Sequence, residues 1–359
     1  MIIFNTKFPY YIIINMSICE SSYKTRGQLP PLSSKPKPYS FRKSTRNQNT
    51  TYRSSTIETR GPRPLILRKT PSKLNLNSNP FHFNPNPSQF KLNFNLNDLE
   101  MGKCIGRGKQ GRVILGSIHS QTYAIKVISK DLLKYANIET NILQTVSNPF
   151  IIKYFGRLED EVNVYLFIEH VQGNDLFHYM RKQRIRLPKA VSFLAQVLEA
   201  LGALHSKGVV YRDLKPENVM INEQETVKII DFGLSKVIDR DRATTVCGSP
   251  EYMAPEVIRK NAYGYSVDYW ALGVLLYEML CGYDLNRHPP FQGENYHEVC
   301  QAILRGHVEF TRSIDPVSKD LIRRLLHTEP AFRLGNLQNK ILDVKAHKFF
   351  NDVDWDVLI

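Results

Sequence analysis

The sequence predicts an α+β fold with two lobes, in which a small β-rich lobe carrying one helix precedes a large α-helical lobe. Two observations support this prediction. Apolar residues alternate between residues 99 and 128, which is typical of neighbouring strands. Beyond Gly173 the apolar residues recur instead at helical spacing. We therefore expect the small lobe over about 97–171 and the large lobe over about 172–355.

Residues 1–96 differ in composition from the rest of the chain. They are rich in Pro, Ser, Thr, Asn, Lys and Arg, and contain 15 Lys and Arg but 2 Asp and Glu. Such a segment buries too little apolar surface to offset its chain entropy, so we expect a disordered basic tail. Residues 97–359 hold 33 basic and 32 acidic residues, so the excess positive charge belongs to the tail. No aromatic or helical pattern accompanies that charge, and we expect no specific nucleic-acid partner.

The cysteines indicate a reducing compartment. Five of them occur far apart, without a Cys-x-x-Cys or Cys/His spacing, which favours a location in the cytoplasm or the nucleus. The apolar stretch Ile2–Ile18 is interrupted by polar residues and is shorter than the ~20 residues of a spanning helix, so we expect no transmembrane segment. It lacks the features of a signal peptide, and Met16 is an alternative start.

The small lobe is expected to contain three strands, a helix and two further strands. Their ranges are Leu99–Met101, Arg112–Gly116, Thr122–Ile128, the helix Asp131–Val146, and then Ile151–Leu158 and Val162–Glu169. In the large lobe, one helix has Pro188 in its first turn and ends at Gly208. A second helix, Val267–Cys281, is apolar nearly all round with Ser266 as its expected cap, which predicts a buried central helix.

Residues 106–113 form a glycine-rich stretch, Gly-Arg-Gly-Lys-Gln-Gly-Arg-Val. Glycines suit a turn whose backbone approaches phosphate oxygens closely. The same spacing occurs in dinucleotide-binding folds, but a helix follows there, whereas a strand follows here. A phosphate-binding hairpin and a purely structural turn both remain open from this motif alone.

Lys126 lies in the middle of an apolar strand, where a lysine is costly unless an anion meets it. Glu139 on the following helix is the natural partner, and a solvated surface glutamate is the alternative. We expect Lys126 to contact both a carboxylate and a phosphate.

Residues 211–218 are more specific, because Tyr-Arg-Asp-Leu-Lys-Pro-Glu-Asn combines a base, two cations and an amide. Phosphoryl transfer needs a carboxylate for the hydroxyl proton, a cation near the γ-phosphate and oxygen ligands for Mg²⁺. Asp213, Lys215 and Asn218 supply these groups in turn. Thirteen residues after Asn218, the sequence Asp231-Phe232-Gly233 supplies a second carboxylate for Mg²⁺.

With these motifs, residues 97–355 resemble the eukaryotic protein kinases. Ala254-Pro255-Glu256 matches the end of their activation segment, and Arg333 is available to pair with Glu256. The resemblance is greatest to the AGC group, especially the cAMP- and cGMP-dependent kinases. Four stretches carry it: Tyr211-Arg212-Asp213, residues 245–252 (Thr-Val-Cys-Gly-Ser-Pro-Glu-Tyr), residues 267–273 (Val-Asp-Tyr-Trp-Ala-Leu-Gly) and residues 333–336 (Arg-Leu-Gly-Asn).

The resemblance implies a bilobal protein-kinase fold with ATP and Mg²⁺ as cofactors between the lobes. Catalytic roles fall on Asp213, Lys215, Lys126 and Glu139, and Mg²⁺ would be held by Asn218 and Asp231. The adenine would meet the backbone at Glu169–Val171 beside Ile168. The residues expected around the nucleotide are Ile105, Gly106, Arg107, Gly108, Lys109, Gln110, Gly111, Arg112, Val113, Ala124, Lys126, Glu169, Val171, Asn218 and Asp231.

The resemblance also implies a serine/threonine specificity, with Lys215 and Ser249 placing the substrate hydroxyl. Carboxylates at Asp175, Glu217, Glu251 and Glu278 imply a preference for basic residues upstream of the phosphorylated residue, although Glu251 and Glu278 have a structural role as their alternative. Thr245 matches the activation-loop phosphorylation site, with Arg212 and Lys236 as partners for its phosphate. Protein substrates, an upstream kinase and an inhibitory regulatory subunit are the implied partners.

Several features depart from the cyclic-nucleotide-dependent kinases. The segment between Lys126 and Glu139 is shorter, Tyr135 replaces a histidine, and Asp284–His288 looks inserted. The sequence ends at Ile359, so we expect another element or a partner to brace the small lobe in place of the AGC C-terminal tail. The alternatives are an Aurora-like kinase, suggested by Leu99–Lys103, and an inactive pseudokinase scaffold, against which Lys126, Asp213, Asn218 and Asp231 all argue.

Overall fold

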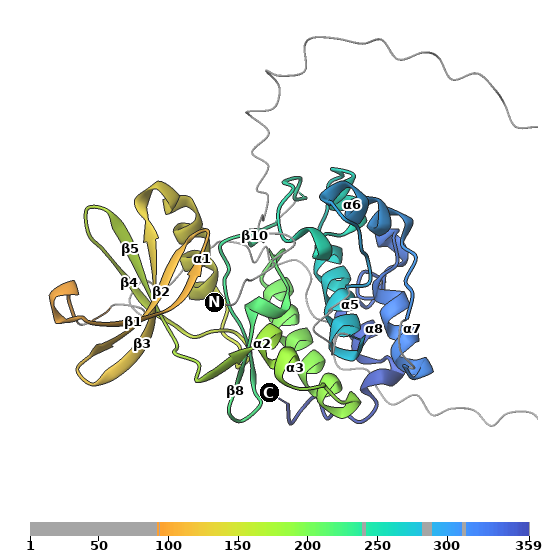
Figure 1. Ribbon diagram of the computed structural model, residues 1–359, viewed down its shortest axis with the longest axis horizontal. Helices are drawn as coiled ribbons and strands as arrows, with labels where there is room; N and C mark the ends of the chain where they lie inside the picture. The colour runs from red at the N-terminus through yellow and green to blue at the C-terminus, as the bar shows by residue number, and fades with distance from the viewer. Residues whose placement is uncertain (1–91, 93, 239–241, 282–288, 311–313, 359) are drawn as a thin grey trace, which may run out of the picture. The chain divides into compact units, whose positions relative to one another are not determined.

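The computed structural model describes residues 92, 94–238, 242–281, 289–310 and 314–358. The small lobe is built on a five-stranded antiparallel sheet in the order β1-β2-β3-β5-β4 (Figure 1). Helix α1 packs against this sheet. Its elements are η2 (Leu96–Asp98), β1 (Glu100–Gly108), β2 (Gly111–Ile118), β3 (Gln121–Ser129), η3 (Lys130–Leu132), α1 (Leu133–Thr145), β4 (Tyr154–Glu159) and β5 (Asn163–Ile168).

The large lobe is mainly helical, with short strands beside the site. The strands are β6 (Gly173–Asp175), β7 (Val209–Val210), β8 (Val219–Asn222), β9 (Val227–Ile229) and β10 (Lys236–Val237). The helices are α2 (Leu176–Lys182), α3 (Leu187–Ser206), η4 (Pro216–Asn218), η5 (Pro250–Tyr252), α4 (Pro255–Ile258), α5 (Ser266–Cys281), α6 (Tyr296–Arg305), α7 (Pro316–Leu325), η6 (Pro330–Phe332), α8 (Ile341–Lys345) and η7 (Lys348–Phe350).

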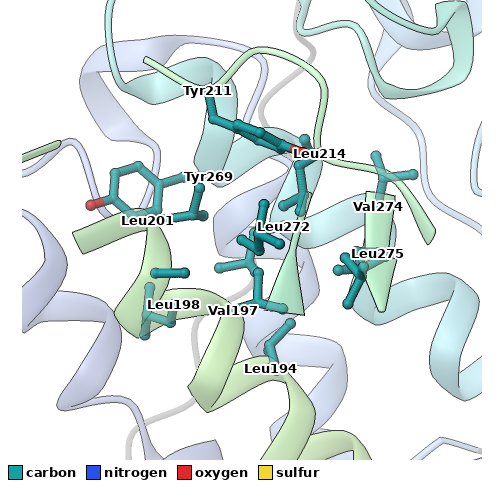
Figure 2. Packing of buried hydrophobic residues seen from close by; sticks show 14 of the residues in the cluster. Leu194, Val197, Leu198, Leu201, Tyr211, Leu214, Tyr269, Leu272, Val274 and Leu275 are labelled. Atoms are coloured by element: carbon teal, nitrogen blue, oxygen red, sulfur yellow. The ribbon is translucent and has the colours of Figure 1, made fainter. Parts of the chain in front are cut away.

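The predicted central helix is confirmed. Every residue of α5 is buried, as expected for a helix that is apolar nearly all round. Leucines and a valine of α3 point into the same cluster as Leu272 and Leu275 of α5 (Figure 2). The predicted start and stop of α3 also hold, because Pro188 lies in its first turn and Gly208 follows its end with φ +76°.

The role of Ser266 differs from the expectation. This serine is the first residue of α5, and its hydroxyl donates to Glu256 Oε1 over 3.0 Å. The side chain therefore links α5 to α4. This bond goes to a side chain and does not cap the backbone of α5.

Residues before the predicted domain boundary pack on the sheet. Phe94 lies 5.3 Å from Phe167 and 6.0 Å from Tyr123, measured between ring centroids. Leu92 and Leu96 join the same apolar cluster, on the sheet face that bears Tyr123 and Phe167. Packed structure thus begins several residues before Asn97, within the segment assigned to the tail. Residues 1–91 and the Asp284–His288 segment lie outside the described residues.

Among the described residues, one helix is long and apolar enough to cross a membrane by length and composition, and it is α3. Eleven residues of α3 are buried in the large lobe, as in the core helix of a folded domain.

Candidate active site

Hydrogen bonds to the Asp268 side chain of α5 fix the turn that carries Asp213. Arg212 has φ +69°, a left-handed conformation that costs energy for a non-glycine residue. The Asp268 carboxylate accepts the N–H groups of Tyr211 at 2.9 Å and Arg212 at 2.8 Å, and it lies 2.8 Å from His205 Nε2. Because the Asp268 side chain is buried, these bonds stabilise the turn that presents Asp213.

Asp213 is fixed by its neighbours in the loop between β7 and β8. Asn218 Nδ2 donates to both the carbonyl and Oδ2 of Asp213, each over 2.8 Å. Lys215 Nζ lies 3.0 Å from Asp213 Oδ2 and donates to Ser249 Oγ over 3.3 Å. The predicted base, cation and amide, and the predicted substrate-placing Ser249, therefore form one connected group.

The environment of Asp213 suits a general base. Burial raises the pKa of its carboxyl to about 6, with the negative charge of Asp231 adding to this and Lys215 opposing it. A carboxylate with this pKa is ionised at neutral pH yet more basic than an exposed aspartate. The N–H of Ile230, the residue before Asp231, donates to the Asn218 carbonyl over 3.0 Å, so the segments that carry the two carboxylates are directly joined.

Lys126 of β3 joins the two lobes. Its Nζ lies 2.6 Å from Glu139 Oε2 on α1 and 2.8 Å from Asp231 Oδ1 in the large lobe. The expected Lys126–Glu139 pair is thus present, while the direct contact with Asp231 was not foreseen. Burial alone would lower the pKa of Lys126, but the two carboxylates outweigh it and hold that pKa above its usual value. The charge of Lys126 in turn overcomes burial and lowers the pKa of Asp231.

The Asp231-Phe232-Gly233 turn is set by contacts on both sides. Asp231 has φ +61°, and its Oδ1 accepts the N–H of Gly233 over 3.3 Å. Phe232 is fully buried, and its ring lies 5.3 Å from that of Tyr211. Its N–H meets Glu139 Oε1 at 3.5 Å. The turn is thereby linked both to α1 and to the catalytic loop.

The donor set fits Mg²⁺. The contacts that the described part of the chain makes with the Asn218 side chain use its amide nitrogen, which leaves its oxygen for a cation. The contacts that described residues make with Asp231 use Oδ1, which leaves Oδ2. Hard oxygen donors from one carboxylate and one amide suit Mg²⁺, which takes its remaining ligands from water and phosphate.

The glycine-rich stretch forms the end of the β1–β2 hairpin, where Gly108 pairs with Gly111. Gly111 has φ +150°, and a Cβ there would overlap the Val127 carbonyl, so this position requires glycine. Burial and the charge of Lys215 lower the pKa of Lys109. Gln110, expected only as part of the loop, has its Oε1 3.4 Å from Lys126 Nζ.

The predicted adenine-side residues lie on adjoining strands. Ala124 is buried and pairs with Ile168, while Val113 pairs with Lys126 across β2 and β3. The N–H of Glu169 donates to the Lys153 carbonyl over 2.9 Å, and its carboxylate lies 3.0 Å from Lys228 Nζ. Ile105, Arg107 and Arg112 are exposed along the hairpin.

The comparisons with known proteins agree with this geometry. A family model described as "Protein kinase domain" matches residues 99–350. The chain belongs to the protein kinase family. Relatives include the cAMP-dependent protein kinase catalytic subunit 3 of Drosophila melanogaster, 39% identical over 272 residues, which are 73% of this chain and 46% of the relative. The type 3 kinase of Saccharomyces cerevisiae is 38% identical over 74% of this chain and 68% of its own.

A human relative, the cAMP-dependent protein kinase catalytic subunit PRKX, is 39% identical over 74% of this chain and 75% of its own length. The match thus spans less than half the length of the fruit-fly relative and more than two thirds of the length of the yeast and human relatives. The resemblance to the AGC group is confirmed. This kinase is a serine/threonine protein kinase with ATP and Mg²⁺ as its cofactors.

The activation segment of the kinase brings Thr245 and Arg212 to a shared partner. Thr245 is exposed, and its carbonyl accepts the hydroxyl of Tyr263 over 2.6 Å. Arg212 Nη1 donates to the same hydroxyl over 3.2 Å. Lys236 lies in β10, paired with Val210 of β7. Within the described residues, no hydrogen bond or ion pair joins the Thr245 hydroxyl to Arg212 or Lys236, so their regulatory roles stay predictions.

The four predicted substrate-reading carboxylates have different surroundings. Glu217 and Glu251 are half-buried on η4 and η5. Asp175 caps α2 by accepting the N–H of His178 over 2.7 Å. Glu278 is buried and accepts the hydroxyl of Tyr252. Asp175 and Glu278 therefore have structural contacts, and for Glu278 this agrees with the alternative of a structural role. Glu217 and Glu251 remain partly accessible.

The expected pairing of Arg333 with Glu256 is present. Arg333 is fully buried, and its two terminal nitrogens donate to the two Glu256 oxygens over 2.6 and 2.9 Å. Arg333 also donates to two backbone carbonyls, and its guanidinium lies 5.1 Å from the centroid of the Trp270 ring. This pair anchors the end of the activation segment to the helical core.

Proposed function

We propose that this kinase transfers the γ-phosphate of ATP to Ser and Thr hydroxyls in protein segments that carry basic residues two to three positions upstream. The observation that supports the transfer is the group formed by Asp213, Lys215 and Asn218, which the hydrogen bond from the Ile230 N–H to the Asn218 carbonyl joins to the segment that carries Asp231. A base, two cations and two potential metal ligands thereby converge on one site.

In the proposed step, the substrate oxygen forms a bond to the γ-phosphorus while the bond from that phosphorus to the ADP oxygen breaks. Asp213 accepts the hydroxyl proton, and Lys215 offsets negative charge near the transferred group. Lys126 orients the α- and β-phosphates. Bound Mg²⁺ supplies further charge neutralisation at the phosphate oxygens. The protein contributes mainly position and electrostatics.

The preference for basic residues is supported by where the carboxylates lie. Lys215 and Ser249 are hydrogen-bonded, and Glu217 and Glu251 each follow one of them by two residues. Two partly accessible carboxylates therefore flank the place where the substrate hydroxyl is expected. Arginine binds carboxylates through paired, charge-assisted hydrogen bonds, so an upstream arginine would suit this surface.

The preference is tested with radiolabelled ATP on a degenerate peptide library. We expect enrichment of Arg at two to three positions before the phosphorylated residue, and Glu217→Gln should reduce that enrichment at one position while leaving activity on other peptides. Asp213→Ala serves as the inactive control. A proline-directed or acidic preference would refute the proposed specificity without refuting the activity, whereas no transfer by the wild type would support an inactive scaffold.

The partners beyond protein substrates rest on the relatives. Two of those named above are described as catalytic subunits of cAMP-dependent kinases. We infer that an inhibitory regulatory subunit and an upstream activating kinase act on this chain, and that it works in the cytoplasm or the nucleus. Co-purification with a cyclic-nucleotide-binding protein that cAMP releases would support the first inference.

A further inference from the structure

The Lys126 ammonium group has all three of its N–H donors directed at protein oxygens. A lysine ammonium carries three donors and no acceptor. Here they meet Glu139 Oε2 at 2.6 Å, Asp231 Oδ1 at 2.8 Å and Gln110 Oε1 at 3.4 Å. A phosphate oxygen that binds Lys126 must therefore replace one of these contacts.

The three contacts differ in strength. Those with Glu139 and Asp231 are short and charge-assisted, and the side chains of Lys126 and Glu139 are almost fully buried. The acceptor on Gln110 is an uncharged amide oxygen and the contact is long, 3.4 Å, so it is the weakest of the three. A phosphate oxygen would displace Gln110 at the lowest cost in free energy.

Gln110 is also positioned by Gly233. A Cβ on Gly233 would overlap Gln110 Oε1 and lie 2.5 Å from Nε2, so the amide rests directly on the glycine. The absence of a side chain at Gly233 makes room for this arrangement. One side chain of the glycine-rich loop thus touches both the Lys126 ammonium and the Asp231-Phe232-Gly233 turn, which are the two elements expected to hold the phosphates and their metal.

We propose that Gln110 competes with the nucleotide phosphates for the third donor of Lys126, and thereby sets the affinity of this kinase for nucleotide. The proposal rests on the proposed function, because it takes Lys126 as the phosphate-binding lysine. It assigns to the Gln110 side chain a role distinct from the backbone contacts expected of the glycine-rich loop. The amide weakens nucleotide binding and speeds nucleotide release.

The test is the dissociation constant of ADP in the presence of Mg²⁺, measured by titration calorimetry on the full chain. Gln110→Met keeps the length of the side chain and removes the amide, and it should bind ADP about two- to tenfold more tightly, the range expected for the loss of one long, weak hydrogen bond. Gln110→Glu places a carboxylate beside Lys126 and should bind ADP at least about tenfold more weakly. Gln121→Met is the matched control, since Gln121 is exposed at the start of β3, and it should match the wild type.

A second measurement is the rate of release of a fluorescent ADP analogue, which should fall in Gln110→Met. Melting temperatures near that of the wild type show that the variants fold. Weaker or unchanged ADP binding by folded Gln110→Met would overturn the proposal, and weaker binding would indicate that the amide donates to the nucleotide. If the wild type bound no ADP, the proposed function would fail together with the inference that rests on it.

Discussion

Asp213 shows how single residues create the chemistry of this site. Burial raises the pKa of its carboxyl, the Lys215 ammonium and the Asn218 amide beside it lower that pKa, and the charge of Asp231 raises it further. The left-handed residue before it, Arg212, is stabilised by Asp268. The hydrogen bonds to Asp268 on the buried helix α5 thus offset the cost of the left-handed conformation of Arg212, and they keep Asp213 in place.

The pKa of Asp213 predicts the acidic limb of the pH–rate profile. Burial raises this pKa to about 6, and the base must be ionised to accept a proton, so kcat/KM for a peptide should fall as the pH drops through about 6. The positive charge of Lys215 lowers this pKa, so Lys215→Met should move the limb to higher pH as well as lower the rate. Steady-state kinetics from pH 5 to 8 measure both profiles. An acidic limb that stays in place in Lys215→Met would contradict this assignment.

The residue-level site could be predicted where a motif fixes both identity and spacing. Asp213, Lys215 and Asn218 lie within six residues of one another, and the Lys126–Glu139 pair follows from a buried lysine and the next helix. The contact between Lys126 and Asp231 spans 105 positions in sequence. The orientation of the Gln110 amide depends on the absence of a side chain at Gly233. Neither the Lys126–Asp231 contact nor this orientation is indicated by a local pattern in the sequence.

At the scale of elements, buried polar pairs join segments that are far apart in sequence. Arg333 follows η6 and pairs with Glu256 of α4, and Ser266 of α5 donates to the same carboxylate. Three elements of the large lobe therefore meet at one charged cluster. The sequence predicted the Arg333–Glu256 pair through resemblance, but gave Ser266 the role of a helix cap, because a serine before an apolar helix usually has that role.

Removing the arginine of this cluster should strongly destabilise the large lobe. Arg333→Ala leaves Glu256 charged and buried without its main partner, which should cost about 3–5 kcal/mol. Arg259→Ala is the matched control, because Arg259 pairs with Glu329 at an exposed position, 3.4 Å away, and its loss should cost about 0–1 kcal/mol. Urea unfolding followed by circular dichroism measures both, and equal losses would contradict the account.

The segment before β1 acts as a brace of the small lobe. Phe94 packs edge-on against Phe167 and tilts towards Tyr123, which in turn packs edge-on against Phe155. Polar asparagines alternate with the apolar residues Leu92, Phe94 and Leu96, so this stretch was placed in the tail on its composition. In the structure these three apolar residues all pack against the cluster on the sheet.

Phe94→Ala should therefore destabilise the small lobe. The ring is partly buried, so we expect a loss of about 1–3 kcal/mol, below the usual cost for a fully buried phenylalanine. Phe332→Ala, at a position 68% exposed, should change stability by less than about 0.5 kcal/mol. Thermal unfolding with and without Mg²⁺ and ADP measures the change, and a Phe94→Ala variant as stable as Phe332→Ala would show that the segment is not a brace.

At the scale of the whole domain, the site exists because the two lobes bring their charges together. The small lobe supplies Lys126 and Glu139, and the large lobe supplies Asp213, Asn218 and Asp231. The two-lobe architecture could be predicted, because the change from strand to helix periodicity is strong and persists over many residues. How the lobes meet depends on side-chain contacts such as that between Lys126 and Asp231, which periodicity does not encode.

The activation segment is expected to respond to phosphorylation as one unit. A phosphate on the exposed Thr245 adds a charge of about −1.5 to −2 near Arg212, which already shares Tyr263 with the Thr245 backbone. Thr245→Ala should lower kcat about tenfold or more relative to the phosphorylated wild type, while leaving ADP affinity within about twofold. Kinetics on phosphatase-treated and untreated enzyme measure the effect. Full activity of unphosphorylated wild type would contradict it.

The most direct measurement of the central claim is the transfer of radiolabelled phosphate from ATP to a serine peptide by wild type, Asp213→Asn and Lys126→Met. If Asp213 is the base that accepts the hydroxyl proton, Asp213→Asn should reduce kcat by about 10²–10⁴-fold while still binding ADP with Mg²⁺. Lys126→Met should lose nucleotide affinity as well as rate. Transfer by Asp213→Asn at the wild-type rate would contradict the account.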